Sequence, residues 1–296
     1  MENVPAVFKE ELLFDFRLHS LREVCKLSMS YAEFAIKTNE NCFRRYFHVM
    51  DGILCEQYDY VYGTKTKHPF GEKSKKYHHS THLDLYATGK IEDIPLNEDL
   101  FKRIFSQGVD SFNFEIDLDV QSIDDKWIKL FVSYKKLFDF CFKVALNNDL
   151  MKLLRRLVET EQLESLELLD SAYNNEVVDL FCKLFMQKQF QVLFLQHYED
   201  NVLAKLLDLW QLNQQIFSQK SLNIEKHIVG EGIVNERFRP CSEEEYIVWR
   251  KTSRTFVNPE DVYILKADFI PSGSDHVVYA TRGVDEEESF TWIKFC

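Results

Sequence analysis

Short alternating apolar pairs recur along the middle of the chain at a nearly constant spacing. Successive pairs begin 26, 26, 27 and 29 residues apart, and helix-like stretches separate them. A strand followed by a helix at this period is typical of a leucine-rich-repeat solenoid, in which stacking of neighbours buries each apolar face. The alternative is a non-repetitive α/β sheet whose strand–helix units have similar lengths. The five pairs are Phe114-x-Ile116, Phe140-x-Phe142, Leu166-x-Leu168, Leu193-x-Leu195 and Leu222-x-Ile224.

Apolar residues three and four positions apart predict the helices between these pairs. The segment 97–108 predicts a further helix that precedes them, with Asn97 as its N-cap and Gly108 as its end. The repeats lack the asparagine that usually follows the last leucine of such a unit, so irregular repeats are expected. The expected helices within the repeats are 124–134, 147–159, 175–187 and 200–215.

Hairpins are expected on either side of the repeats. Asp51-Gly52 stands between two aromatic and β-branched runs, which predicts a tight turn joining strands at 44–50 and 53–61. A polar, lysine-rich loop is expected at 64–80. Near the C-terminus, 262–270 alternates as a strand, and 276–282 and 289–295 predict a hairpin with an acidic turn. The polar stretch 229–260 reads as a linker or long loop, within which 243–254 could add a helix or a strand.

Two short amphipathic helices are expected at the N-terminus. The first begins near Pro5, where the missing N–H of proline costs nothing. Ser20 then caps a second helix, and Glu23 completes a capping box. The apolar stripe of the second helix is Leu21, Val24, Cys25, Leu27, Tyr31 and Phe34.

Composition narrows the environment and the partners of the chain. The formal net charge of −12 over 296 residues disfavours nucleic-acid binding by the whole surface. The sequence contains no run of eighteen apolar residues, so no membrane span is predicted. The first residues do not have the pattern of a secretory signal. The seven cysteines never form C-x-x-C, which favours a reduced, cytoplasmic or nuclear protein. They are Cys25, Cys42, Cys55, Cys141, Cys182, Cys241 and Cys296.

Two groups of polar residues are candidates for a metal-binding or catalytic site. His78, His79 and His82 in "KYHHSTH" suggest zinc, but a solvated loop is the better interpretation, because no further ligands stand at paired spacing. Carboxylates alternate at Glu115, Asp117 and Asp119, where a metal or acidic binding face competes with an ordinary half-exposed strand. No nucleotide, hydrolase or metalloprotease motif is present. The sequence thus predicts no catalytic, cofactor-binding or metal-binding residues, and an enzyme of unrecognised type that uses both groups stays the alternative.

The loop 64–82 also carries a cluster of lysines. Such a patch could meet an acidic partner or RNA, and a plain solvated loop is the favoured reading. Its role is left open by the sequence. The lysines are Lys65, Lys67, Lys73, Lys75 and Lys76.

The N-terminal segment resembles an F-box, the helical module that docks onto the Skp-type adaptor of cullin–RING ubiquitin ligases. The resemblance rests on "VP" at 4–5, Phe8, "LL" at 12–13, Phe16 and "LREVCKL" at 21–27, and covers about 35 residues. The sequence pattern of the whole chain also resembles that of nematode-expanded families of F-box-like proteins. The resemblance implies an adaptor-binding surface, whereas the alternative is a helical cap over the edge of the domain behind it. The implied adaptor-binding residues are Pro5, Phe8, Leu12, Leu21, Val24, Cys25 and Leu27.

Together these features predict an α/β protein with an N-terminal helical F-box-like module, a β-hairpin, and an irregular leucine-rich-repeat-like βα solenoid ending in β-strands. The expected domains are the module at 1–40, the hairpin and polar loop at 41–96, and the repeat domain at 97–296. The expected function is a non-enzymatic substrate receptor of a Skp–cullin ligase that binds an unknown target protein through its repeat domain, with no cofactor, nucleic-acid or membrane partner. A stand-alone interaction protein without adaptor docking is the alternative.

Overall fold

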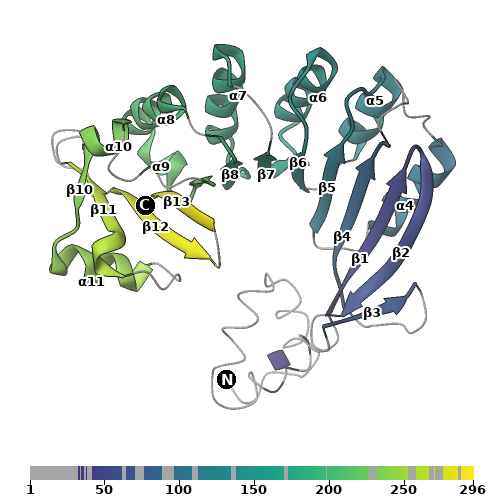
Figure 1. Ribbon diagram of the computed structural model, residues 1–296, viewed down its shortest axis with the longest axis horizontal. Helices are drawn as coiled ribbons and strands as arrows, with labels where there is room; N and C mark the ends of the chain where they lie inside the picture. The colour runs from purple at the N-terminus through teal and green to yellow at the C-terminus, as the bar shows by residue number, and fades with distance from the viewer. Residues whose placement is uncertain are drawn as a thin grey trace. The chain divides into compact units, whose positions relative to one another are not determined.

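The computed structural model divides the chain into two compact units, Met1–Phe138 and Asp139–Cys296 (Figure 1). Each unit is described by itself. The residues that the structure describes are 33, 35, 36, 38, 42–61, 65–70, 77–88, 97–108, 113–134, 138–169, 173–197, 199–225, 228, 232–252, 258–266, 270, 276–285 and 288–296.

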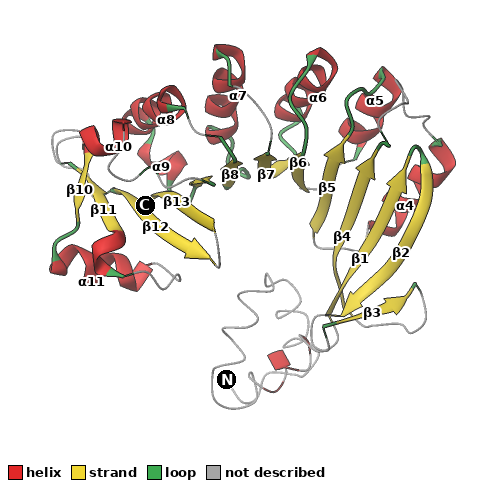
Figure 2. Ribbon diagram, in the orientation of Figure 1, coloured by secondary structure: helices red, strands yellow, loops and turns green. Residues whose placement is uncertain are grey.

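The first unit is a mixed sheet with helices on one face. Its strands lie in the order β5-β4-β1-β2-β3, where β1 pairs in parallel with β4 and β4 with β5, while β2 is antiparallel to both β1 and β3 (Figure 2). The elements are β1 (Cys42–Met50), β2 (Ile53–Val61), β3 (Thr66–Pro69), β4 (Tyr77–Tyr86), α4 (Glu98–Gly108), β5 (Asn113–Asp119) and α5 (Asp125–Ser133).

The hairpin of β1 and β2 is confirmed at the expected turn. Asp51 and Gly52 both have positive φ angles, 51° and 79°. This is the backbone that a two-residue turn with the twist of its strands requires, and that an Asp-Gly pair adopts at low cost. The hairpin does not stand apart from the rest of the fold, because β1 also pairs with β4 along its whole length.

Aromatic side chains hold α4 and α5 against one face of this sheet. Phe114 of β5 is fully buried and stacks on Phe105 of α4 with ring centroids 5.1 Å apart. Phe101 of α4 meets Trp127 of α5 edge-on at 4.4 Å. Asn97 accepts a hydrogen bond from the Leu100 N–H, so the predicted cap of α4 is confirmed. The opposite face of the sheet therefore carries the alternate residues of each strand.

The second unit begins with alternating strands and helices. Asn147 and Asn174 cap α6 and α7 through their side-chain oxygens. The elements are β6 (Phe138–Phe142), α6 (Asn148–Glu159), β7 (Leu163–Leu168), α7 (Asn175–Phe185), β8 (Val192–Leu195), α8 (Asp200–Leu212), α9 (Gln214–Phe217), β9 (Ser221–Ile224), α10 (Gly232–Arg237), β10 (Phe238–Pro240), α11 (Glu243–Thr252), the 3-10 helix η1 (Pro259–Asp261), β11 (Val262–Leu265), β12 (Val278–Asp285) and β13 (Glu288–Phe295).

The periodic apolar pairs of the second unit lie in register. β7, β8 and β9 are parallel, and Leu166 is the partner of Leu193, which in turn is the partner of Leu222. All three side chains are fully buried. At roughly 1.5–3 kcal/mol for each fully buried leucine, this ladder is a main source of stability in the second unit.

Antiparallel strands complete the second unit in the order β9-β13-β12-β11-β10. The expected C-terminal hairpin is confirmed as β12 and β13. The stretch 229–260 is not a linker, because it contributes α10, β10 and α11, and residues 243–252 of the undecided segment form the helix α11. Trp249 of α11 packs into a buried cluster with Val262, Ile264 and Tyr279, so this part of the chain belongs to the fold.

The expected fold class is wrong. The chain is a mixed α/β protein whose sheet starts at Cys42, with antiparallel strands both at β1–β3 and at β10–β13. A leucine-rich-repeat solenoid would stack one parallel strand per repeat. The local period of a βα unit is the same in either fold, so the spacing of the apolar pairs cannot show which strands outside the repeats join the sheet.

The expected F-box-like helical module falls almost entirely outside the described residues. Only positions 33, 35, 36 and 38 of the first 41 residues are described, and they are helical. The proposed adaptor-binding residues, from Pro5 to Leu27, are not among them. None of the helices in the described part of the chain is long and apolar enough to span a membrane.

Candidate functional site

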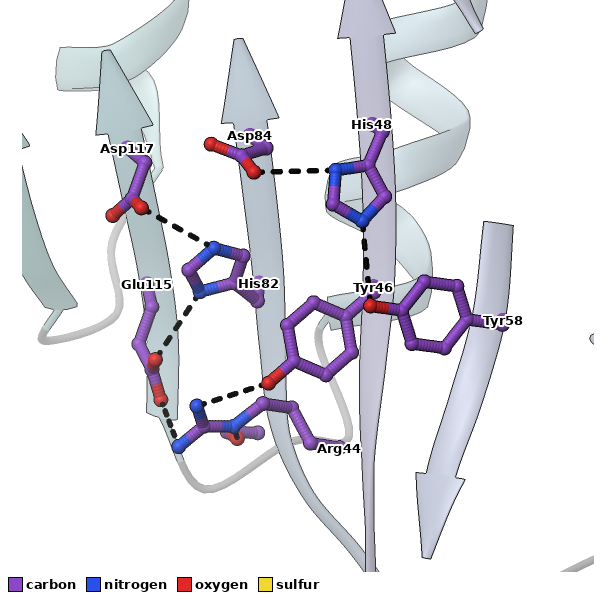
Figure 3. A network of polar contacts seen from close by, with 9 residues as sticks. Arg44, Tyr46, His48, Tyr58, His82, Asp84, Glu115 and Asp117 are labelled. Carbon is purple, nitrogen blue, oxygen red and sulfur yellow. Dashed lines mark hydrogen bonds and ion pairs between the residues drawn. The ribbon is translucent and has the colours of Figure 1, made fainter. Parts of the chain in front are cut away.

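Charged and aromatic side chains gather on the sheet face of the first unit that lies opposite α4 and α5 (Figure 3). They come from alternate positions of β1, β2, β4 and β5, and the residues between them are mostly buried on the helix-covered face. We call this surface the network face. Its residues are Arg44, Tyr46, His48, Tyr58, His82, Asp84, Glu115 and Asp117.

Strand register places these residues in rows across the sheet. His82 of β4 stands beside Tyr46 of β1 and Glu115 of β5. The next row along the strands holds His48, Asp84 and Asp117. Because paired strands lie about 4.8 Å apart, side chains in one row are within reach of one another.

His82 is the centre of the network. Its Nδ1 lies 3.3 Å from Glu115 Oε2, and its Nε2 lies 3.5 Å from Asp117 Oδ2. Its side chain is only 13% exposed, so these contacts are partly shielded from water. Tyr46 leans over the imidazole with ring centroids 5.0 Å apart.

The two carboxylates change the protonation of His82. Burial desolvates the ring and by itself lowers the pKa, but the contacts with Asp117 and Glu115 outweigh burial and raise the pKa of His82 to about 9. Burial would in turn raise the pKa of Glu115, yet His82 and Arg44 hold that pKa below its ordinary value. At neutral pH the metal-free network therefore contains an imidazolium between two carboxylates.

Arg44 extends the network along β1. Its Nη2 lies 3.0 Å from Glu115 Oε1, its Nε donates to Ser80 Oγ at 2.9 Å, and its Nη1 donates to the Tyr46 hydroxyl at 3.3 Å. A guanidinium with partners on three sides is fixed in position. Glu115 is thus held between two cationic groups.

A second branch joins His48, Asp84 and Tyr58. His48 Nδ1 lies 3.2 Å from Asp84 Oδ2, and its Nε2 lies 3.4 Å from the Tyr58 hydroxyl. Tyr46 stacks on Tyr58 with ring centroids 4.8 Å apart. Burial, followed by the negative charges nearby, raises the pKa of Tyr58. The hydroxyl therefore stays protonated and can donate a hydrogen bond.

One part of the network has the ligand types of a metal site. His82, Asp84 and Asp117 each offer one ligand atom, and these atoms all lie within 4.8 Å of one another. One imidazole and two carboxylates suit a divalent transition-metal ion. Among the described residues, this is the group whose geometry admits such an ion.

The thiols of Cys42 and Cys241 are poor nucleophiles in this fold. Burial raises the pKa of Cys42 and of Cys241 to about 12 in each case. The thiolate is the reactive form of cysteine, and it is disfavoured at both positions. These side chains behave as small apolar groups within the fold.

The structure corrects the reading of the histidine-rich segment. Residues 77–86 form strand β4, whereas the expected loop included the part of this segment up to residue 82. Parallel pairing of β4 with β5 brings His82 together with Glu115 and Asp117, so the two polar groups that the sequence presented separately meet at one place. Asp119 is exposed at the end of β5.

Five network residues were missed in the sequence: Arg44, Tyr46, His48, Tyr58 and Asp84. A usable signal is present, because polar residues stand at every second position of β1, in the same phase as His82 and Asp84 in β4. Alternation shows that such residues share a face of one strand. It does not show which strands become neighbours.

Comparison with known proteins gives no match, whether to a family model, a curated protein or a solved structure. The chemistry of the network face therefore rests on its own residues. Their geometry combines fixed charges, aromatic surface and a set of ligands for a metal ion.

Proposed function

We propose that the protein is a non-enzymatic substrate receptor of a Skp–cullin ubiquitin ligase. Residues 4–35 recruit the Skp-type adaptor, and the folded α/β region that follows binds the target protein through the network face. The network face is the observation that carries the second half of this proposal, and the F-box resemblance supports the first half.

The N-terminal sequence supports adaptor docking. The apolar stripe that includes Leu21, Val24 and Leu27 follows helical spacing. An amphipathic helix of this kind docks by laying its apolar face in a groove of a partner. The described fold begins soon afterwards, at β1, so a docked segment is joined to the recognition region by a short stretch of chain.

The network face supports protein recognition. Tyrosine and arginine are enriched at protein interfaces, and Arg44, Tyr46 and Tyr58 lie together here. Their mutual contacts fix the side chains before binding, which lowers the entropy that association costs.

Adaptor binding is tested with the purified full chain and a purified Skp-type adaptor in a calorimetric titration. We expect binding by the native chain and its loss in a variant carrying Val24→Asp and Leu27→Asp, because the charges disrupt an apolar docking stripe. A variant with Ser30→Asp and Asn39→Asp adds the same charge away from this stripe and has to bind as the native chain does.

Two outcomes decide against the ligase proposal. If the native chain is folded but does not bind the adaptor, the ligase proposal is replaced by that of a stand-alone interaction protein. If the Val24 and Leu27 variant loses the circular-dichroism spectrum and cooperative unfolding of the native fold, the segment is a structural cap of the domain behind it.

Target binding is tested in cells that express the full chain. Proteins whose ubiquitination depends on the chain have to lose that modification when Arg44→Gln and Tyr46→Phe are combined, while adaptor binding persists. Lys205→Gln, a matched loss of one cation on α8 of the second unit, serves as the control. Unchanged ubiquitination with the network variant would place target binding on another surface.

A further inference from the structure

We propose that the network face binds one divalent transition-metal ion of the zinc class through His82 Nε2 and the carboxylates of Asp84 and Asp117. This site does not depend on adaptor docking. It would give the recognition face a fixed Lewis-acidic centre with one open coordination position, at which a carboxylate or another oxygen ligand of a bound target could bind.

The spacing of the ligands fits such an ion. Two ligands of a tetrahedral zinc ion lie about 3.4 Å apart, given metal–ligand distances of about 2.1 Å. His82 Nε2 and Asp117 Oδ2 are 3.5 Å apart, which is close to that value and longer than a good hydrogen bond. All three ligand atoms lie within 4.8 Å, so a side-chain movement of at most about 1.5 Å would complete the set.

The surrounding residues orient two of the ligands. Glu115 lies at Nδ1 of His82, which directs the other nitrogen of the ring toward Asp117 (Figure 3). A carboxylate behind a metal-binding histidine commonly sets its tautomer in this way. His48 likewise holds one oxygen of Asp84 at 3.2 Å, and the second oxygen of that carboxylate can bind the ion.

The ligand types indicate which class of ion binds. Two carboxylates balance the charge of a divalent cation, and the imidazole favours zinc and its neighbours over magnesium and calcium, which prefer oxygen ligands. Three protein ligands also leave a coordination position open. Such positions distinguish sites that bind a further molecule from closed structural sites.

The test is a calorimetric titration with zinc of the full chain, after a chelator has removed bound metal. We expect a site with one ion per chain whose affinity falls at least 100-fold in Asp117→Asn, because the anionic ligand is lost while the shape is kept. Glu115→Gln, which acts through His82, has to weaken binding by about 10–100-fold. Asp119→Asn on the same strand is the matched control and has to bind as the native chain does.

A second measurement covers variants that fail to fold. Zinc added to the native chain, labelled at its imidazole rings, has to shift the NMR signals of the His82 ring at one equivalent, whereas magnesium has to leave them in place. Undiminished zinc affinity in a folded Asp117→Asn chain, or His82 signals that do not respond, would overturn the site.

Discussion

Both compact units contain strands followed by helices, but they carry different side chains on the sheet face that points away from the helices. In the first unit one row reads Tyr46, His82 and Glu115, with the two last residues in contact. In the second unit, an outward row across β7, β8 and β9 contains Glu167, Phe194 and Asn223. The inward positions are mostly apolar in both units, with the ion pair of Arg45 and Asp59 as an exception in the first. Burial therefore constrains one face of each sheet, and the outward face is where the residue chemistry of the two units differs.

The two units also differ in how the surroundings of a buried cation change its pKa. His82 has carboxylate partners, and its pKa is raised to about 9. Lys220 in the second unit is 3% exposed and donates hydrogen bonds to the backbone carbonyls of Gln187 and Phe190. Burial lowers the pKa of Lys220 to about 8. Charged partners favour the cation in the first unit, whereas neutral partners in the second unit offset burial only in part.

The largest effect is expected in the apolar ladder of the second unit. Leu193→Ala should lower the free energy of unfolding by about 3 kcal/mol, because it leaves a cavity between buried leucines. Val192→Ala, on the outward side of the same strand, should cost less than about 1 kcal/mol. Denaturant unfolding of both variants checks this, and equal losses would remove the distinction between the two faces of β8.

Removal of one charge from the network face should have the next largest effect. Glu115→Gln leaves His82 and Arg44 without their shared carboxylate, and should destabilise the first unit by about 2 kcal/mol, since the site is only partly shielded. Glu167→Gln at an outward position of β7 is the control, with an expected change within about 0.5 kcal/mol. Chemical denaturation of both proteins makes the comparison, and a larger loss for Glu167→Gln would reverse it.

The buried lysine predicts a pH dependence of the opposite sign to that of a paired cation. Between a folded pKa of about 8 and the ordinary value of 10.5, the unfolded chain binds more protons at Lys220 than the folded chain does. The free energy of unfolding should therefore rise with pH in this window, by up to about 2 kcal/mol from this residue. The rise is measured as the difference between the native chain and Lys220→Met at pH 7.5 and pH 10. Parallel pH profiles of the two proteins would show that Lys220 keeps its ordinary pKa.

The smallest effect concerns a helix cap in the second unit. Asn147 accepts hydrogen bonds from the N–H groups of Asp149 and Leu150, each at 3.0 Å. Asn147→Ala should cost about 1 kcal/mol, because these donors lose their partner. Asn148→Ala, one residue further and exposed, should change the thermal midpoint much less. Equal shifts would mean that the cap adds nothing to the helix it begins.

Locally encoded elements could be predicted from the sequence. The turn at Asp51-Gly52 needs only two residues with positive φ, and the helix after Asn97 needs only its cap and its apolar spacing. The strands around Leu166, Leu193 and Leu222 were found because burial on one face imposes alternation. Helix α11 could not be decided, because its short stretch of charged and apolar residues fits either element.

The network face could not be predicted, because it depends on pairing between distant strands. His82 and Glu115 are 33 residues apart in the chain and become neighbours only through the parallel register of β4 and β5. The polar segment before Leu83 and Leu85 looked like a solvated loop, and its strand character rests on contacts with β1 and β5. Sequence alone therefore singled out His82, Glu115 and Asp117, but it showed neither their proximity nor the other five residues of the network face.

The central claim is that the network face is one interlocked site rather than a set of independent surface charges. A double-mutant cycle with His82→Phe and Glu115→Gln, measured by denaturant unfolding in the presence of a chelator, tests it most directly. We predict a coupling energy of about 1–3 kcal/mol, as found for residues that share a buried network. A coupling below about 0.5 kcal/mol, as exposed ion pairs give, would contradict the claim.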